Sequence, residues 1–191
     1  MKENTIKKTY ESGERELVRV NISYPSAPED YFAGGSRFDM YHKKLAEAYL
    51  SFAAGRLFRH ARKKMPENPY GAVLRSMVSF ENDEYVSVVC DALLTLDDPK
   101  PRTERTATVW SRESGTMLTV SSFFTEGALR LLHQKLGCDA KKCVFFLTNK
   151  GYGFTTDGEN TTIIPYGSLS ADDGKHEGLE KKCIKTSLQP S

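Results

Sequence analysis

The sequence predicts an α+β fold in which one long and one short helix pack on one face of a mostly antiparallel sheet. Three observations lead to this prediction. An alternating apolar segment precedes a long helical pattern, tight turn sequences join most of the later hydrophobic runs, and a shorter helical pattern interrupts them. The expected order is one strand, the long helix, four strands, the short helix and three strands. Most of these strands are expected to be antiparallel, because tight turns can join antiparallel strands but not parallel ones.

The first strand and the long helix have the clearest patterns. Residues 16–24 alternate apolar and polar side chains, which is typical of a half-buried strand. Ser36 is the expected N-cap of the helix, which continues to about Lys64 and ends before Pro66. At 1.5 Å per residue it is roughly 40 Å long, so it extends past the sheet that it crosses. Its predicted apolar stripe is Phe38, Tyr41, Leu45, Ala48, Tyr49, Phe52 and Leu57.

The remaining elements follow as hairpins around the second helix. Residues 73–80 and 85–96 are the most distinct hairpin, and residues 103–110 and 116–120 form another. The short helix begins at Ser122 or Thr125 and ends at Gly137, a residue that commonly follows helices. The apolar run 144–148 predicts a central strand. Residues 152–155 and 161–165 complete the pattern between turn sequences.

Composition favours one globular domain. The chain has 191 residues, a mean hydropathy of -0.49 and 39% hydrophobic residues. Its net charge is only +2, which argues against a protein that coats nucleic acid. We expect a polar N-terminal segment over 1–15, a single domain over 16–169 and a flexible polar tail over 170–191.

The sequence contains no apolar segment long enough for a secretory signal or a transmembrane helix. As written, the chain is therefore expected in the cytoplasm, without a membrane span. If the sequence is a trimmed ectodomain, the alternative is an extracytoplasmic location. The sequence does not predict an oligomeric state.

Motifs for catalysis and cofactor binding are missing, so we expect no enzyme activity, no cofactor and no metal. Gly151-Tyr152-Gly153 resembles half of a dinucleotide fingerprint, but a hairpin whose glycines relieve strain fits it better. His133 with Cys138 and Cys143 matches no usual zinc spacing.

The four cysteines are Cys90, Cys138, Cys143 and Cys183. The pair Cys138 and Cys143 follows the expected end of the short helix. We interpret both as reduced, partly buried thiols, and a disulfide or a reactive thiol stays open. Lys141 and Lys142 are expected to lower the pKa of Cys143.

Cations are concentrated near the end of the long helix, including Arg56 and Arg59. One interpretation is that they complement the negative end of the helix dipole. The other is that they bind an anion or a partner. The run is too short and too poor in aromatic residues to suggest nucleic-acid binding.

Three ordered stretches carry a family resemblance. They are Val78–Val89 (VSFENDEYVSVV), Ser114–Phe124 (SGTMLTVSSFF) and Phe146–Phe154 (FLTNKGYGF) followed by Ile163–Leu169 (IIPYGSL). Together with the early Ile22–Pro25, this set resembles the RsiV-like domain-of-unknown-function family. Its members include the ectodomain of lysozyme-sensing anti-sigma factors and an accessory domain of some peptidoglycan deacetylases. The resemblance implies an α+β domain of a Gram-positive bacterium that binds a ligand and does not catalyse.

The leading functional hypothesis is therefore a non-enzymatic recognition domain for a protein or a cell-wall glycan. Its predicted partner-binding residues are Asp97, Asp98, Arg102, Arg105, Phe123, Phe124, Arg56 and Arg59. One alternative is a hydrolase-like enzyme for a small anionic or glycan substrate, using Asp91 or Asp98 with an arginine of the helix end. A second alternative, which rests on the resemblance alone, is a structural protein of the envelope or of sporulation.

Overall fold

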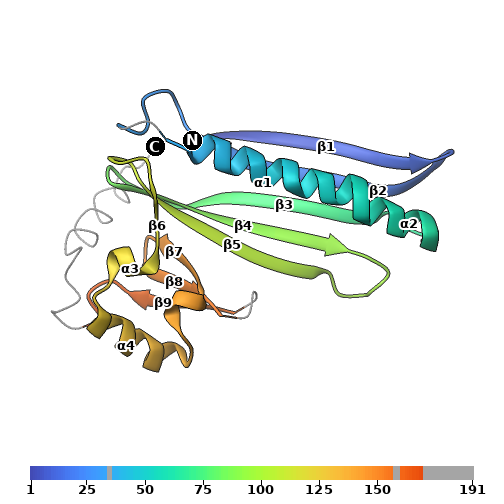
Figure 1. Cartoon of the computed structure of the whole chain (residues 1–191). Coiled ribbons are helices and arrows are strands. Elements are labelled where there is room, and N and C mark those ends of the chain that lie inside the picture. The colour runs from blue at the N-terminus through green and yellow to red at the C-terminus, as the bar shows by residue number, and fades with distance from the viewer. Residues whose placement is uncertain (34–35, 157–159, 170–191) are drawn as a thin grey trace, which may run out of the picture. The chain divides into compact units, whose positions relative to one another are not determined.

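The computed structural model describes residues 1–33, 36–156 and 160–169 (Figure 1). Its strands are β1 (Lys2–Ser12), β2 (Arg15–Ser26), β3 (Tyr70–Glu81), β4 (Tyr85–Thr95), β5 (Arg102–Ser111), β6 (Met117–Leu118), β7 (Val144–Thr148), β8 (Gly151–Thr155) and β9 (Thr161–Pro165). Its helices are α1 (Phe38–Phe52), the π-helical turn η1 (Ala53–Leu57), α2 (Phe58–Lys64), α3 (Val120–Phe123), α4 (Glu126–Leu136) and the 3₁₀ turn η2 (Ala140–Lys142). The predicted α+β class is confirmed.

The strands divide between two sheets. One has six strands in the order β1-β2-β3-β4-β5-β6, and the other has three in the order β7-β8-β9. Strand β7, which the sequence predicts as central, is at an edge of its sheet, and β8 is in the middle. On the open edge of β7, one backbone donor has a side-chain partner: the buried Leu147 N–H donates to the Ser87 hydroxyl at 3.0 Å.

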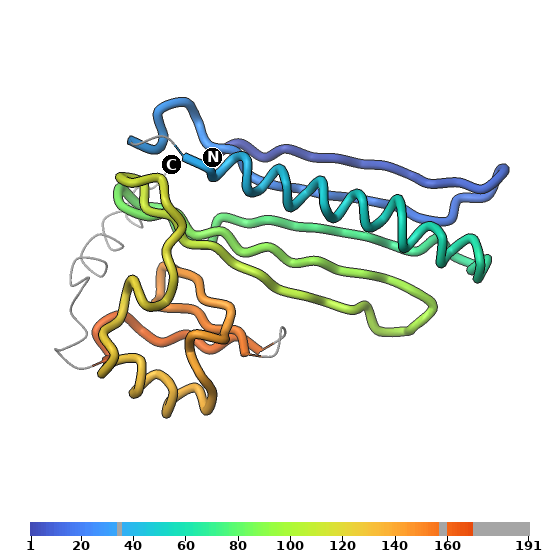
Figure 2. Tube along the Cα trace, viewed as in Figure 1, coloured from blue at the N-terminus to red at the C-terminus, as the bar shows by residue number. Residues whose placement is uncertain are grey.

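Strands β2 and β3 are parallel, with Val18 opposite Tyr70 and Ser23 opposite Arg75. The long helix is the crossover between them, and Figure 2 shows the trace returning along α1 and α2 before β3 begins. A parallel pair requires such a long connection, so this exception to the antiparallel pattern follows from the helix itself. The β1–β2, β5–β6, β7–β8 and β8–β9 pairs are antiparallel.

The first strand, β1, has no counterpart among the predicted elements. Residues 1–15 are predicted as a polar segment, whereas Lys2–Ser12 pairs along its length with β2. The strand lies at the edge of the sheet, where lysines and other polar residues discourage pairing with a second chain. Its two apolar side chains, Ile6 and Tyr10, are half-buried, and the Tyr10 ring packs 5.8 Å from that of Phe58 on α2.

The long helix ends at its predicted residue, but its N-cap is Arg37 and not the predicted Ser36, whose hydroxyl accepts from the Phe38 N–H at 2.9 Å. Its buried face overlaps the predicted stripe only in part. The helix ends at Lys64 with Met65 in the left-handed conformation, and η1 interrupts the regular helix. The predicted stripe includes Ala48, which is exposed. The residues that are buried are Phe38, His42, Ala46, Ala53, Leu57 and Ala61. Three alanines among them let the helix backbone approach the strands closely, which a stripe of large side chains would prevent.

The chain forms two compact units. Of the described residues, unit 1 comprises 1–31, 36–77 and 90–105, and unit 2 comprises 32–33, 78–89, 106–156 and 160–169. Strands β3, β4 and β5 each contribute one end to unit 1 and the other end to unit 2. The predicted tail over 170–191 lies outside the described residues.

Unit 2 has an aromatic core around β8. Phe154 and Phe123 are almost fully buried there, and Phe145 lies 5.3 Å from each of them between ring centroids. The short helix contributes Ala128 and Leu132 to the same cluster. Thr125 caps that helix by accepting from the Ala128 N–H, and Gly137 ends it in the left-handed conformation, as predicted.

Two glycines in β8 allow the close packing of this core, which supports the hairpin interpretation of Gly151-Tyr152-Gly153. A Cβ on Gly153 would lie 2.4 Å from the Phe146 ring. A Cβ on Gly151, whose φ is +155°, would lie 2.2 Å from the Ile164 carbonyl oxygen. Any other residue at either position would therefore collide with β7 or β9.

Candidate recognition site

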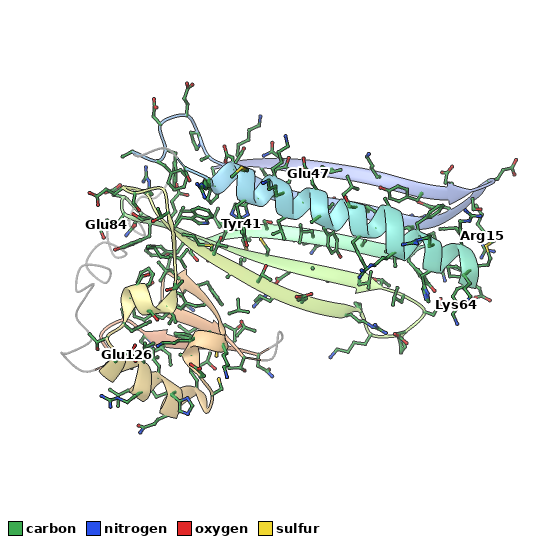
Figure 3. All side chains as sticks on the ribbon, in the orientation of Figure 1. Arg15, Tyr41, Glu47, Lys64, Glu84 and Glu126 are labelled. Atoms are coloured by element: carbon green, nitrogen blue, oxygen red, sulfur yellow. The ribbon has the colours of Figure 1, made fainter. Side chains whose placement is uncertain are left out.

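Four segments that are distant in the sequence meet at one end of unit 1. At the start of β2, next to the β1–β2 turn, the Arg15 guanidinium donates to the carbonyl of Pro66, which follows α2. His60 of α2 stacks on the Tyr70 ring at the start of β3, with centroids 5.8 Å apart. The Tyr70 hydroxyl donates to Asp97 in the β4–β5 loop at 2.6 Å. Figure 3 shows Arg15 and Lys64 at this same end of the long helix.

Tyr70 holds these segments together. Its side chain is 1% exposed, and burial, followed by the hydrogen bond to Asp97, raises the pKa of Tyr70 to about 12. The hydroxyl therefore stays protonated and donates at any physiological pH. The loop that carries Asp97 and Asp98 is thereby attached to the end of the helix.

Five cations cover the helix at this end, and we call them the basic end: Arg56, Arg59, Arg62, Lys63 and Lys64. All five are exposed. Within the part of the chain that the structure describes, none of them forms an ion pair. Arg59 donates only through Nε, to the Gly55 carbonyl at 3.2 Å.

The predicted contact residues of the β4–β5 region have different environments. Asp98 and Arg102 form an exposed pair at 3.2 Å, with side chains that are 59% and 70% accessible. Asp97 is bound to Tyr70. Arg105 makes two bonds to Asp91, with Nε and a terminal nitrogen at 2.7 and 2.8 Å from the carboxylate oxygens. Asp98 and Arg102 remain accessible to a partner, whereas Arg105 is engaged within the sheet.

Phe123 and Phe124 cannot offer a contact surface in this structure, contrary to the sequence-based expectation. They are 1% and 2% exposed and belong to the core of unit 2. Phe123 is the last residue of α3, and Phe124, which follows it, packs against Tyr152 in the same aromatic cluster. The free energy of removing two phenylalanines from water explains their position.

The carboxylates needed by the hydrolase-like alternative have structural partners. Asp91 pairs with Arg105, and Asp98 pairs with Arg102. That alternative requires Asp91 or Asp98 to act with an arginine of the helix end, and both pair instead with arginines of β5. Across residues 1–33, 36–156 and 160–169, no group of three or more potential metal ligands comes together either, and His133 does not complete a site with the two cysteines.

The Asp91–Arg105 pair is expected to stabilise unit 1 measurably. Its two side chains are only 27% and 25% exposed, and its bidentate geometry is the favourable one. A double-mutant cycle with Asp91→Ala and Arg105→Ala, measured by urea unfolding, should give a coupling free energy of about 1 kcal/mol. The same cycle on the exposed Asp98–Arg102 pair is the control and should give less than about 0.5 kcal/mol. Equal couplings would contradict this expectation.

The two thiols are free, as expected, but the pKa of Cys143 differs from the sequence-based expectation. Cys138 and Cys143 are free and half-buried, with their sulfur atoms 3.2 Å apart. Burial, followed by the hydrogen bond and the charge of Cys138, raises the pKa of Cys143 to about 12. The predicted lowering by Lys141 and Lys142 is therefore wrong, because desolvation of the sulfur outweighs the attraction of two solvated ammonium groups.

One notable buried residue, His42, was missed by the sequence analysis. It is fully buried on the sheet side of α1, with its ring 4.4 Å from Phe38 and 5.2 Å from Tyr41. Burial lowers its pKa to about 4. Its position between Phe38 and Ala46, four residues from each, was the signal that could have identified it.

No helix in the described part of the chain has both the length and the apolar character to span a membrane. No family model matches the sequence, and no curated protein matches it significantly.

Two solved structures have a similar fold. One is a DUF3298 family protein of Pseudomonas aeruginosa, with 14% identity, a TM-score of 0.56 and a similarity that covers 90% of this chain and 95% of that one. The other is a DUF3298 family protein of Bacteroides fragilis, with 12% identity and a TM-score of 0.53, covering 96% and 97% of the two chains. At such low identity the similarity shows the fold alone.

Proposed function

We propose that the chain is a non-enzymatic recognition domain of the RsiV-like type that binds a carboxylate- or phosphate-bearing ligand at its basic end. A cell-wall glycan fragment is the favoured ligand class. The observation that carries the proposal is the set of exposed cations on α2 and η1 that form no ion pair with any described residue. The fold similarity to two DUF3298 family proteins supports an α+β domain of this kind, and the sequence resemblance supports the RsiV-like type.

The helix dipole accounts for only part of the basic end. Its influence is confined to about the last turn, which here contains Arg62, Lys63 and Lys64. Arg56 and Arg59 precede that turn, and Arg56 lies within η1. A dipole gives no reason for cations at these two positions, whereas an extended anionic ligand does.

The attachment of the surrounding segments favours binding over catalysis. Tyr70 and Arg15 hold the helix end against the β4–β5 loop and the β1–β2 turn, so the cations project from a rigid support. A preorganised surface loses less conformational entropy on binding. The Asp97 carboxylate beside the helix end accepts from Tyr70, and Asp91, further back in β4, pairs with Arg105, so both are held in structural contacts.

Calorimetric titration of the chain with soluble peptidoglycan fragments, and separately with lysozyme, tests the proposal. The variant Arg59→Glu/Arg62→Glu reverses two neighbouring charges of the basic end. The control Lys43→Glu/Lys44→Glu reverses two exposed charges on α1 and changes the net charge equally. The first variant should weaken binding at least about tenfold, which corresponds to 1.4 kcal/mol, and the control should leave it nearly unchanged.

The two probes distinguish the ligand classes. Binding of the fragments without their breakdown, checked by chromatography of the recovered material, is the expected result. Binding of lysozyme alone would replace the glycan by a protein ligand. Absence of binding to both probes, or equal weakening by both double variants, would refute a recognition role for the basic end.

A further inference from the structure

The structure brings two thiols of unit 2 close together in the connection between α4 and β7. Cys138 follows the glycine that ends α4, and Cys143 directly precedes β7. The sulfur atoms are 3.2 Å apart, which is about 1 Å more than a disulfide bond requires. This pair takes no part in the proposed recognition site, which belongs to unit 1.

The turn between the two cysteines is held by several hydrogen bonds. The Asp139 side-chain carboxylate accepts from the Lys141 backbone N–H at 2.9 Å, and the Asp139 backbone carbonyl accepts from the Lys142 backbone N–H at 2.9 Å. The Cys143 thiol also donates to the Asp139 carbonyl at 3.5 Å. Ala140 anchors the turn in the core of unit 2. The sulfur atoms are thus held near one another by the fold, and closing the bond requires only a small adjustment.

We propose that Cys138 and Cys143 are a redox-active dithiol that is converted to an intramolecular disulfide by exchange with a small-molecule disulfide such as oxidised glutathione. The Cys138 thiolate attacks one sulfur of the small disulfide, which releases one thiol and leaves a mixed disulfide on Cys138. Cys143 then loses its proton, attacks the Cys138 sulfur and releases the second thiol. The protein sulfurs lose two electrons, and the small disulfide is reduced to two thiols.

The environment of the pair supports this order of events. The high pKa of Cys143 makes its sulfur a poor first nucleophile. Part of that rise comes from the charge of a Cys138 thiolate, and this charge disappears once Cys138 carries the mixed disulfide. Cys143 is then easier to ionise, and the second step follows the first. The short segment between the two residues favours a disulfide that is readily reduced again, because closing a short loop removes little entropy from the unfolded chain.

Mass spectrometry of the tryptic digest tests the proposal on the full chain. Trypsin cuts after Lys141 and Lys142, so a disulfide joins the peptides 136–141 and 143–150. The folded, reduced protein and its Cys183→Ser variant are incubated with glutathione disulfide, free thiols are blocked with N-ethylmaleimide, and the digest is searched for the joined peptide. Both proteins should yield it, and addition of reduced glutathione should remove it.

Cys90 and single-cysteine variants provide the controls. Cys90 is buried beside the Ser76 hydroxyl, and burial raises its pKa, so it should react at least about tenfold more slowly than the pair. Cys143→Ser should stop at a glutathione adduct on Cys138. The proposal is overturned if the joined peptide forms only after denaturation, or if both cysteines of the folded protein carry separate glutathione adducts.

Discussion

The variant Phe154→Ala is expected to lose about 4 kcal/mol of the free energy of unfolding. Phe154 is fully buried on the central strand β8, and its ring contacts those of Phe145 and Phe124. The strands on either side prevent the sheet from collapsing into the space that the ring leaves, so the loss includes both hydrophobic transfer and a residual cavity. Urea unfolding followed by the fluorescence of Trp110, the single tryptophan and a residue of unit 2, measures the change.

Ile163→Ala is the matched control for this prediction. Ile163 lies on the adjacent strand β9 opposite Gly153, and its side chain is 36% exposed. Its truncation removes an apolar side chain from the same sheet without opening a cavity, so the expected loss is about 1 kcal/mol or less. If the two variants lost similar stability, the aromatic cluster would not be the main support of unit 2.

A second large effect is expected on acidification, and it comes from His42. Burial lowers the pKa of His42 from 6.5 to about 4 in the folded state. Between these pH values the unfolded chain binds a proton that the folded chain does not, so the free energy of unfolding decreases as the pH falls. The contribution is fully present above pH 6.5, and about 3 kcal/mol is lost by the time the pH reaches about 4.

The variant His42→Phe isolates this contribution, because a phenylalanine suits the aromatic surroundings and does not titrate. Urea unfolding of the wild type and the variant, followed by circular dichroism between pH 7.5 and 4, should show a smaller decrease for the variant. The exposed His133→Gln is the control and should keep the wild-type dependence. Parallel curves for wild type and His42→Phe would contradict the assignment.

Much of the fold could be predicted from the sequence because local patterns report it directly. The alternation in 16–24 identified β2, and the helical spacing with Pro66 identified the ends of the long helix. Thr125 and Gly137 marked the second helix. These features depend on neighbouring residues along the chain, and such short-range signals survive in a single sequence.

Other elements depend on partners that are distant in the sequence. Strand β1 is polar, and only its pairing with β2 makes it a strand. Phe123 and Phe124 are predicted from the sequence as partner-binding residues, yet both rings fill a core that β7 and β8 help to build. Ala48 fitted the apolar stripe, but the contact with the sheet is centred on His42, Ala46 and Ala53.

The candidate site shows the same division. The concentration of cations near the end of the long helix was visible in the sequence, and so was the pair of cysteines. The sequence did not show that Tyr70 joins the helix end to Asp97, or that the β5 arginines take Asp91 and Asp98 as partners.

The sequence by itself determined the α+β class, the long helix, the hairpins and the types of residue available for binding, because side-chain periodicity and turn chemistry act over a few residues. Only the tertiary structure decided the parallel β2–β3 pair, the separation into two sheets and the burial of Phe123, Phe124 and His42. Those features depend on which distant segments pack together and remove one another from water. Desolvation also raises the pKa of Cys143, although two lysines are its neighbours in the sequence.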